Sequence, residues 1–297
     1  MQVFVTGATG FVGSAVVQEL LGAGHQVLGL ARSEEAAQAL TAAGAKVHRG
    51  SLDDLDSLRR GAEAADGVIH CAFIHDFTQY AAAAEADRRA IAAMGNVLAG
   101  SNRPFIATSG FAGLTNQGTL LTEDDARDPD VQAMRHSEDA ALALVPQGVR
   151  AMVVRLAASV HDKNDHGFVP TLISIAREKG EAAYIGDGRN RWPAVHRLDA
   201  ARLYRLAIEH GVAGARYHGV ADEGIDLRTI AEVIGRHLQV PVVSKTREEA
   251  PAHFGWMASF AGLDLAASST LTQQRLDWHT THPGLLVDLE QGHYFAN

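Results

Sequence analysis

The chain has 297 residues, of which 46% are hydrophobic and 21% charged, and its formal net charge is −9. This length and composition suit a globular protein with a sizeable core in one or two domains, and the negative charge without any Lys/Arg run argues against nucleic acid or an anionic membrane as a partner. The single cysteine, Cys71, excludes an internal disulfide framework, and no apolar run approaches the ~20 residues of a membrane span, so we expect a cytoplasmic protein.

The first half of the chain alternates short apolar runs with helical patterns. The predicted strands are Gln2–Thr6, Gln26–Ala31, Ala45–His48, Gly67–Ala72, Pro104–Thr108 and Val149–Arg155. The predicted helices are Phe11–Leu21, Glu34–Ala43, Asp54–Arg60, Tyr80–Leu98 and Val131–Val145. This alternation is typical of an α/β fold with a doubly wound parallel sheet and helices on both faces.

After Arg155 the alternation loosens. We predict helices at Gly167–Lys179, Asp199–Glu209 and Asp226–Leu238, a Gly-rich turn region at Tyr184–Arg191, and one more sheet strand at Tyr217–Val220. We therefore divide the chain into a main domain, residues 1–160, and a smaller C-terminal cap, residues 161–297. Residues of about 192–222 are expected to return from the cap to the main domain.

Three glycines at a spacing of three, Gly7, Gly10 and Gly13, follow the first strand and open the first helix. In such a loop the first glycine permits a sharp turn, the second lets the backbone approach a pyrophosphate, and the third allows close helix–sheet packing. The helix N-terminus adds unpaired N–H donors and a partial positive charge. The loop therefore predicts a binding site for the diphosphate of a dinucleotide.

The end of the second strand indicates which dinucleotide binds. A carboxylate there would bind the ribose 2′-OH and repel a 2′-phosphate, but the strand ends in Arg32 and Ser33, and the first acid is Glu34. Arg32 can offer a planar fork to a phosphate and Ser33 a hydroxyl, although Ser33 also suits a helix cap. We predict NADP(H) as the cofactor, with NAD(H) as the alternative.

The GxxGxxG spacing in VFVTGATGFVG, with the later segments GSLDD and VHRLDAARL, resembles the short-chain dehydrogenase/reductase superfamily, in its extended or atypical, epimerase/dehydratase-like branch. The resemblance covers essentially the whole chain. It implies a Rossmann dinucleotide-binding domain followed by a substrate-binding cap, and it makes a homodimer a fair expectation. It also implies that Thr9, Phe11 and Val12 line the diphosphate together with the three glycines.

The resemblance implies further cofactor contacts. Asp53, in GSLD, would lie near the adenine amino group, with a helix N-cap as its alternative role. Cys71, Ala72 and Phe73 would lie beside the nicotinamide ribose, where the family has an Asn-Ala-Gly-like turn, so the sequence departs from the pattern there. We expect Cys71 to be a small wall residue, because no helix N-terminus or cation clearly activates it as a nucleophile.

The superfamily's proton donor is missing from this chain. The resemblance implies a tyrosine four residues ahead of a lysine, with a Ser or Thr at the end of the fifth strand, where Thr108 and Ser109 stand. None of the tyrosines, at positions 80, 184, 204, 217 and 294, has a lysine four residues later. The helix that should carry the pair can be aligned with Met134 and Glu138, or with Asp130 and Met134, at these positions, and both alignments lack it.

Another group must then supply the proton, or no proton is supplied. We take Ser109, His136 and Tyr184 as the candidate catalytic residues, because histidine titrates near neutrality and Tyr184 begins a YIGDG segment that resembles the family's border of the substrate cleft. His75, just past the fourth strand, is a further candidate. No spacing of His, Cys, Asp or Glu indicates a metal site.

These features predict an NADP(H)-dependent oxidoreductase with an atypical active site, which transfers hydride between the nicotinamide and a small carbonyl, imine or activated alkene. Two alternatives stay open. The chain resembles redox-sensing regulators that bind a dinucleotide without catalysis, and it also resembles isomerases and lyases of the epimerase/dehydratase type. Fold analogy alone does not select among them.

Overall fold

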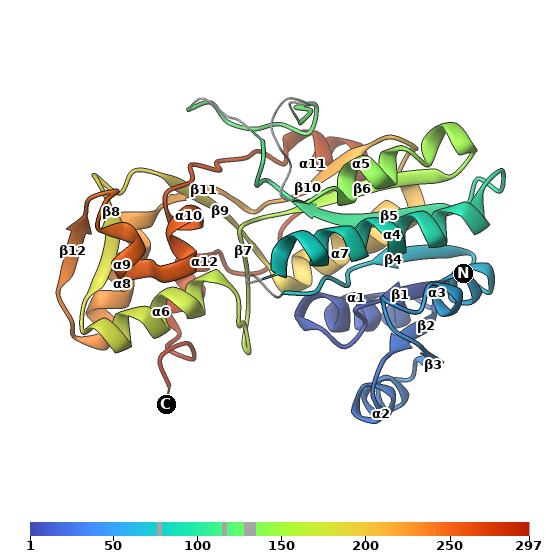
Figure 1. The fold of residues 1–297 in the computed structure, drawn as a ribbon, viewed down its shortest axis with the longest axis horizontal. Helices are drawn as coiled ribbons and strands as arrows, with labels where there is room; N and C mark the ends of the chain where they lie inside the picture. Colours follow the sequence, from blue (N-terminus) through green and yellow to red (C-terminus); the bar gives the residue numbers. More distant parts are fainter. Residues whose placement is uncertain (76–78, 115–117, 128–134, 297) are drawn as a thin grey trace.

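The computed structural model describes residues 1–75, 79–114, 118–127 and 135–296, and it contains a large lobe and a smaller one (Figure 1). The large lobe is built on a seven-stranded sheet in the order β10-β6-β5-β4-β1-β2-β3. Its strands are β1 Gln2–Thr6, β2 Gln26–Ala31, β3 Lys46–Arg49, β4 Gly67–His70, β5 Pro104–Gly110, β6 Arg150–Leu156 and β10 Arg216–Gly219. All neighbouring strands are parallel, so the predicted doubly wound α/β sheet is confirmed.

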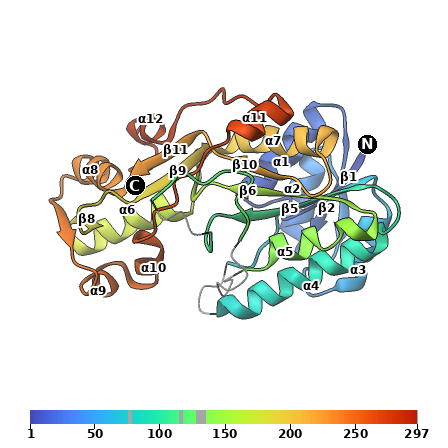
Figure 2. The ribbon, with the colours of Figure 1, turned by 90° about the horizontal axis from the view of Figure 1, so that it is seen from above.

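Helices cover both faces of this sheet, as right-handed crossovers require. Their bounds are α1 Phe11–Gly22, α2 Glu34–Ala42, α3 Leu55–Glu63, α4 Tyr80–Leu98, α5 Ser137–Leu142, η2 Val145–Gln147, α7 Arg197–His210 and α11 Thr270–Leu276. Helix α1 packs against α7 on one face, and α3, α4 and α5 pack side by side on the other (Figures 1 and 2). The strands therefore bury both faces: Val3 and Val5 lie in one core cluster and Phe4 in the other.

The end of the chain completes the core of the large lobe. Trp278, just after α11, is fully buried in the same cluster as the α1 and α7 side chains. Its indole Nε1 donates a hydrogen bond to the backbone oxygen of Asp199 in α7, at 2.9 Å. Leu265 and Leu276 belong to the same cluster. Residues more than 260 positions along the chain thus complete the core that contains α1 and α7, and α11 itself contacts α7 and β10.

The smaller lobe, called the cap below, has its own apolar core. Its strands are β7 Ser159–His161, β8 Ala182–Ile185, β9 Arg191–His196, β11 Asp222–Asp226 and β12 Val242–Lys245. Its helices are α6 Phe168–Lys179, α8 Leu227–Leu238, α9 Ala250–Phe254, η3 Gly255–Met257, α10 Ala258–Ala261 and α12 Leu285–Glu290. The strands form a three-stranded sheet, β11-β9-β7, and a two-stranded one, β12-β8.

Several predicted elements differ from the structure. The expected helix Val131–Val145 is observed as α5 and η2, and residues 128–134 lie outside the described residues. The expected turn region Tyr184–Arg191 begins inside strand β8 and ends at the first residue of β9. These strands were not predicted, because four- to six-residue strands in an irregular lobe carry too few side chains to show a period.

Candidate active site

The glycine loop between β1 and α1 forms a tight cradle. Gly7 has φ +65°, a conformation that favours glycine, and its carbonyl accepts a hydrogen bond from the Gly10 N–H at 2.9 Å. A Cβ on Gly13 would lie 2.0 Å from the Gly7 oxygen, and one on Gly7 would lie 2.7 Å from the Ala72 nitrogen. Only glycine, which has no Cβ, fits at these two positions. The loop can therefore lie in direct contact with both the end of β4 and α1.

This cradle fits a dinucleotide diphosphate. Helix α1 has 12 residues, begins after Gly10 and carries no acidic residue in its first turn. The N–H groups of its first turn lack intrahelical acceptors and suit an anion. Thr9 and Gly10 are exposed at the mouth, whereas Phe11 and Val12 are half-buried. The predicted loop residues therefore lie together around one helix N-terminus.

At the end of β2 the structure adds a second arginine to the predicted pair. Arg32 is exposed, and the Ser33 hydroxyl caps α2 by accepting a hydrogen bond from the Ala36 N–H at 3.2 Å. Arg49, which is in parallel register with Ala31, donates to the Ser33 carbonyl at 2.9 Å and forms an ion pair with Glu34. The carboxylate of Glu34, the first acid after the strand, is thus already engaged by a cation. Sequence reasoning missed Arg49, although its place at the end of the next strand is a usable signal.

Asp53 is exposed in the turn that follows β3. The alternative role considered for it, capping α3, belongs to its neighbour: the Asp54 carboxylate accepts a hydrogen bond from the Ser57 N–H at 2.9 Å. The Asp53 side chain is therefore not used as that cap.

Two neighbouring strands end in predicted site residues: Cys71, Ala72 and Phe73 follow β4, and Thr108 and Ser109 lie at the end of β5. In a doubly wound sheet of this order, ligands bind beyond the carboxyl ends of the strands, at the switch point between β1 and β4. The Thr108 hydroxyl bonds to Tyr204 of α7 at 2.7 Å and to the His70 carbonyl at 2.8 Å. Burial raises the pKa of the Cys71 thiol to about 12, which leaves it protonated at neutral pH.

Ser109 is almost completely buried, at 5% exposure, in register with Arg155 of β6. Behind it lies a buried ionic network. Arg155 binds both oxygens of Glu138 at 2.7 and 2.8 Å, and Arg216 binds the same carboxylate at 2.6 Å. Burial alone would raise the pKa of Glu138, but the hydrogen bonds from the two arginines outweigh it and the pKa is lowered.

His218 in this network is held in its neutral form. Its Nε2 accepts a hydrogen bond from Arg155 at 3.2 Å and its Nδ1–H donates to the Ser268 carbonyl at 2.7 Å. Burial, and then the charge of Arg155, lower the pKa of His218 to about 3.

We expect His218 to make the protein sensitive to mild acid. Because its pKa is lower folded than unfolded, the unfolded chain binds the extra proton first, and stability falls as the pH drops below about 6.5. Between pH 7 and pH 5 this group should cost about 2 kcal/mol. Urea unfolding at both pH values should show a smaller loss for His218→Gln than for the wild type; an equal loss would contradict the assignment.

The other two candidate catalytic residues, His136 and Tyr184, lie away from Ser109. His136 is half-exposed on the outer face, 3.6 Å from Asp139, and lines a surface groove of about 400 Å³ between α4 and α5. Tyr184 lies in the two-stranded sheet of the cap, where it contacts Gly188 and the Arg228 guanidinium. Figure 1 shows β8 at the far end of the cap, away from the main sheet.

A residue that sequence reasoning missed, Arg135, lies at the end of β4 instead. Its guanidinium carbon is 4.0 Å from the centroid of the Phe73 ring. Its Nη2 bonds to Asp87 of α4 at 3.2 Å, and its Nε donates to the Ser137 hydroxyl at 2.5 Å. The one available signal was that Arg135 is the only Lys or Arg between residues 128 and 149.

Asp87 is itself buried, at 1% exposure, in a chain of hydrogen bonds that starts next to the glycine cradle. The Ala72 N–H donates to the Thr6 hydroxyl, which bonds to His70 Nδ1 at 2.7 Å, and His70 Nε2 bonds to Asp87 at 3.1 Å. The Ser137 hydroxyl donates to Asp87 at 2.5 Å. Burial would raise the pKa of Asp87, but His70, Arg135 and Ser137 together lower it.

The cap reaches the opposite side of the cradle. The centroid of the His166 ring lies 5.8 Å from that of the Phe11 ring. The guanidinium carbon of Arg197 lies over the Phe11 ring, 4.8 Å from its centroid. Arg197 is paired with Asp162 at 2.9 Å. Burial raises the pKa of the neighbouring Asp165 to about 6. Groups from both lobes therefore face the mouth of α1.

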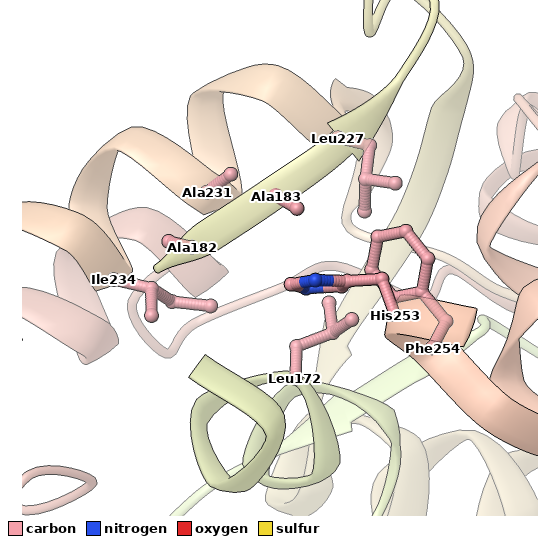
Figure 3. Close-up of a pocket in the computed structure, with 8 residues that line it drawn as sticks. All are labelled: Leu172, Ala182, Ala183, Leu227, Ala231, Ile234, His253 and Phe254. Carbon is pink, nitrogen blue, oxygen red and sulfur yellow. The ribbon is translucent and has the colours of Figure 1, made fainter. Parts of the chain in front are cut away.

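An apolar cavity within the cap is too small to serve as a substrate site. Its volume is about 10 Å³, enough for one water molecule. Figure 3 shows Leu172, Leu227 and Phe254 around the His253 ring at this place. The carboxyl edge of the main sheet, where Phe11, Phe73 and Ser109 follow or end their strands, is the better candidate.

Comparison with known proteins identifies the family of this chain. The model of the NAD dependent epimerase/dehydratase family matches residues 3–220, which contain the cradle, both strand ends and α7. The chain belongs to the NAD-dependent epimerase/dehydratase family.

Relatives of this family member include oxidoreductases. An uncharacterized protein of Schizosaccharomyces pombe is 50% identical over 99% of this chain and 100% of its own. A Stigmatella aurantiaca ketoreductase of a farnesylated dihydroquinoline oxide is 27% identical over 86% of this chain and 80% of its own. A Streptomyces venezuelae dTDP-glucose 4,6-dehydratase, solved with NAD bound, superposes with a TM-score of 0.78 at 18% identity, covering 99% and 98% of the two chains.

The resemblance to the short-chain dehydrogenase/reductases, extended branch, is thus confirmed, and NAD(P) is the cofactor class of this family. Among the described residues, no helix combines the length and apolar character needed to cross a bilayer.

Proposed function

We propose that this family member is an NADP(H)-dependent oxidoreductase acting on a small carbonyl, imine or activated alkene. The observation that carries the choice of NADP(H) is the end of β2, where Arg32 is exposed and Arg49 neutralises Glu34. Two guanidinium groups near the expected ribose suit a 2′-phosphate, whereas NAD-binding sites use an unpaired carboxylate.

Different groups along the carboxyl edge of the sheet bind the diphosphate, the nicotinamide half and the substrate. The amides of α1 hold the diphosphate, and Cys71, Ala72 and Phe73 form the wall beside the nicotinamide half. Ser109, at the end of β5, is our candidate for orienting the substrate's reacting group. When bound, the dinucleotide supplies or accepts a hydride.

We expect Arg32→Ala to weaken NADPH binding about tenfold and NADH binding by less than twofold, because one charged hydrogen bond to an exposed phosphate is lost. Fluorescence titration of the purified protein with each dinucleotide measures both effects. Arg59→Ala is the control, since Arg59 is an exposed arginine that pairs with Asp56 on α3. Equal losses for NADPH and NADH would remove the 2′-phosphate argument.

Turnover then separates the candidate functions. An oxidoreductase consumes NADPH with some member of a carbonyl, imine or enone panel, measured by absorbance at the nicotinamide band. An isomerase or lyase of the epimerase/dehydratase type changes its substrate with no net loss of NADPH. Tight NADPH binding with no turnover, together with a protein partner in pull-downs, would favour a sensor.

A further inference from the structure

We propose that Arg135 is a catalytic residue that stabilises the negative charge developing on the substrate oxygen. This inference rests on the function proposed above. Adding a hydride to a carbonyl carbon forms a C–H bond and moves the π electron pair to oxygen, while the dinucleotide is oxidised. The oxygen then takes a proton from water. A cation fixed in advance beside that oxygen lowers the barrier.

The position of Arg135 suits this role. Phe73 lies two residues past Cys71 at the end of β4, beside the switch point between β1 and β4 where ligands bind in sheets of this order. The Arg135 guanidinium stacks 4.0 Å from the Phe73 ring, and its side chain is 18% exposed. Its charge acts on Cys71, on Tyr204 and on His75, which surround the same strand end.

The fixation of Arg135 is more elaborate than a surface contact requires. Ser137 binds its Nε, Asp87 binds its Nη2, and Ser137 also bonds to Asp87. His70 holds Asp87 from the other side, and both of these side chains have at most 1% exposure. Burying such ions gives little net stability, and an exposed cation–π contact contributes only about 0.5–1 kcal/mol. What the arrangement does provide is one fixed orientation of a cation at the strand end.

Arg135→Gln tests the proposal, because glutamine keeps hydrogen-bond donors but removes the charge. With the best acceptor of the panel we expect kcat to fall about 100-fold, the typical cost of removing one oxyanion stabiliser, with KM changed little. Arg135→Lys should recover part of this loss. Arg88→Gln is the control, since Arg88 is an exposed arginine on α4 paired with Glu85.

A binding measurement tests the same charge without turnover. A cation beside the nicotinamide disfavours the positively charged ring of NADP⁺, so the ratio of the Kd of NADP⁺ to that of NADPH should fall about fivefold in Arg135→Gln. Asp87→Asn removes the neutralising carboxylate and should move the ratio the opposite way. If Asp87 had a purely structural role, the two variants would not shift the Kd ratio in opposite directions.

If Arg135→Gln has the wild-type kcat and an unchanged Kd ratio, the proposed role of Arg135 is overturned. The proposed function still stands in that case, provided that the wild type binds NADPH. If the variant does not fold, Asp87→Asn carries the same test through the Kd ratio, and Arg135→Lys, which keeps the charge, is expected to leave the ratio close to that of the wild type. A wild type that binds neither dinucleotide overturns both proposals.

Discussion

Replacing Gly13 by alanine is expected to reduce NADPH affinity by about 100-fold, which corresponds to about 3 kcal/mol. The new Cβ would lie 2.0 Å from the Gly7 oxygen and 2.7 Å from the Gly7 carbonyl carbon. Both are backbone atoms, so no side chain can rotate away. Either α1 moves off the loop or the hydrogen bond from Gly10 to Gly7 breaks, and in both cases the amides no longer converge on one anion.

Gly22→Ala in the same helix is the matched control. A Cβ there meets nothing within 4 Å, so we expect unchanged NADPH binding and a stability gain of about 0.4–1 kcal/mol. Fluorescence titration and thermal unfolding of both variants separate loss of the cradle from loss of the fold. Wild-type affinity in a folded Gly13→Ala protein would refute the assignment of the cradle.

The second large effect is expected at Glu138. Glu138→Gln removes the carboxylate that pairs with the guanidinium of Arg155, which has 0% exposure, and with that of Arg216. Removing one partner of such a buried pair typically costs about 3–5 kcal/mol. Urea unfolding at pH 7 measures the change.

Glu85→Gln provides the contrast, because its pair with Arg88 is half-exposed on α4. We expect it to cost less than about 1 kcal/mol. A loss at Glu138 no greater than the loss at Glu85 would mean that the buried network does not hold β6 and α5 together.

The fold of the large lobe was predictable because both faces of its sheet are buried. Strands such as Gln2–Thr6 and Pro104–Gly110 appear as nearly continuous apolar runs, separated by helices that have their own period. The cap gave weaker signals. Its strand β8 has only four residues, and its pairing with β12 joins segments about 60 residues apart. Local patterns cannot encode such a pairing.

The candidate site was predictable where it depends on backbone and unpredictable where it depends on tertiary contacts. Glycine spacing predicted the cradle because Gly7 and Gly13 occupy positions where a Cβ would clash with backbone atoms. Arg135 and Asp87 are 48 residues apart, and only the packing of α5 against α4 brings them together. His136 and Arg135 are adjacent, yet one faces a surface groove and the other the end of β4. Just before the start of α5, a shift of one residue along the chain therefore decides which side chain reaches the site.

The burial of Trp278 against α7 has a consequence for synthesis on the ribosome. The chain emerges N-terminus first, so β1, the glycine loop and α1 leave the exit tunnel long before the indole that completes their core is made. The buried cluster that α1 and α7 share can therefore be completed only after nearly the whole polypeptide has been translated.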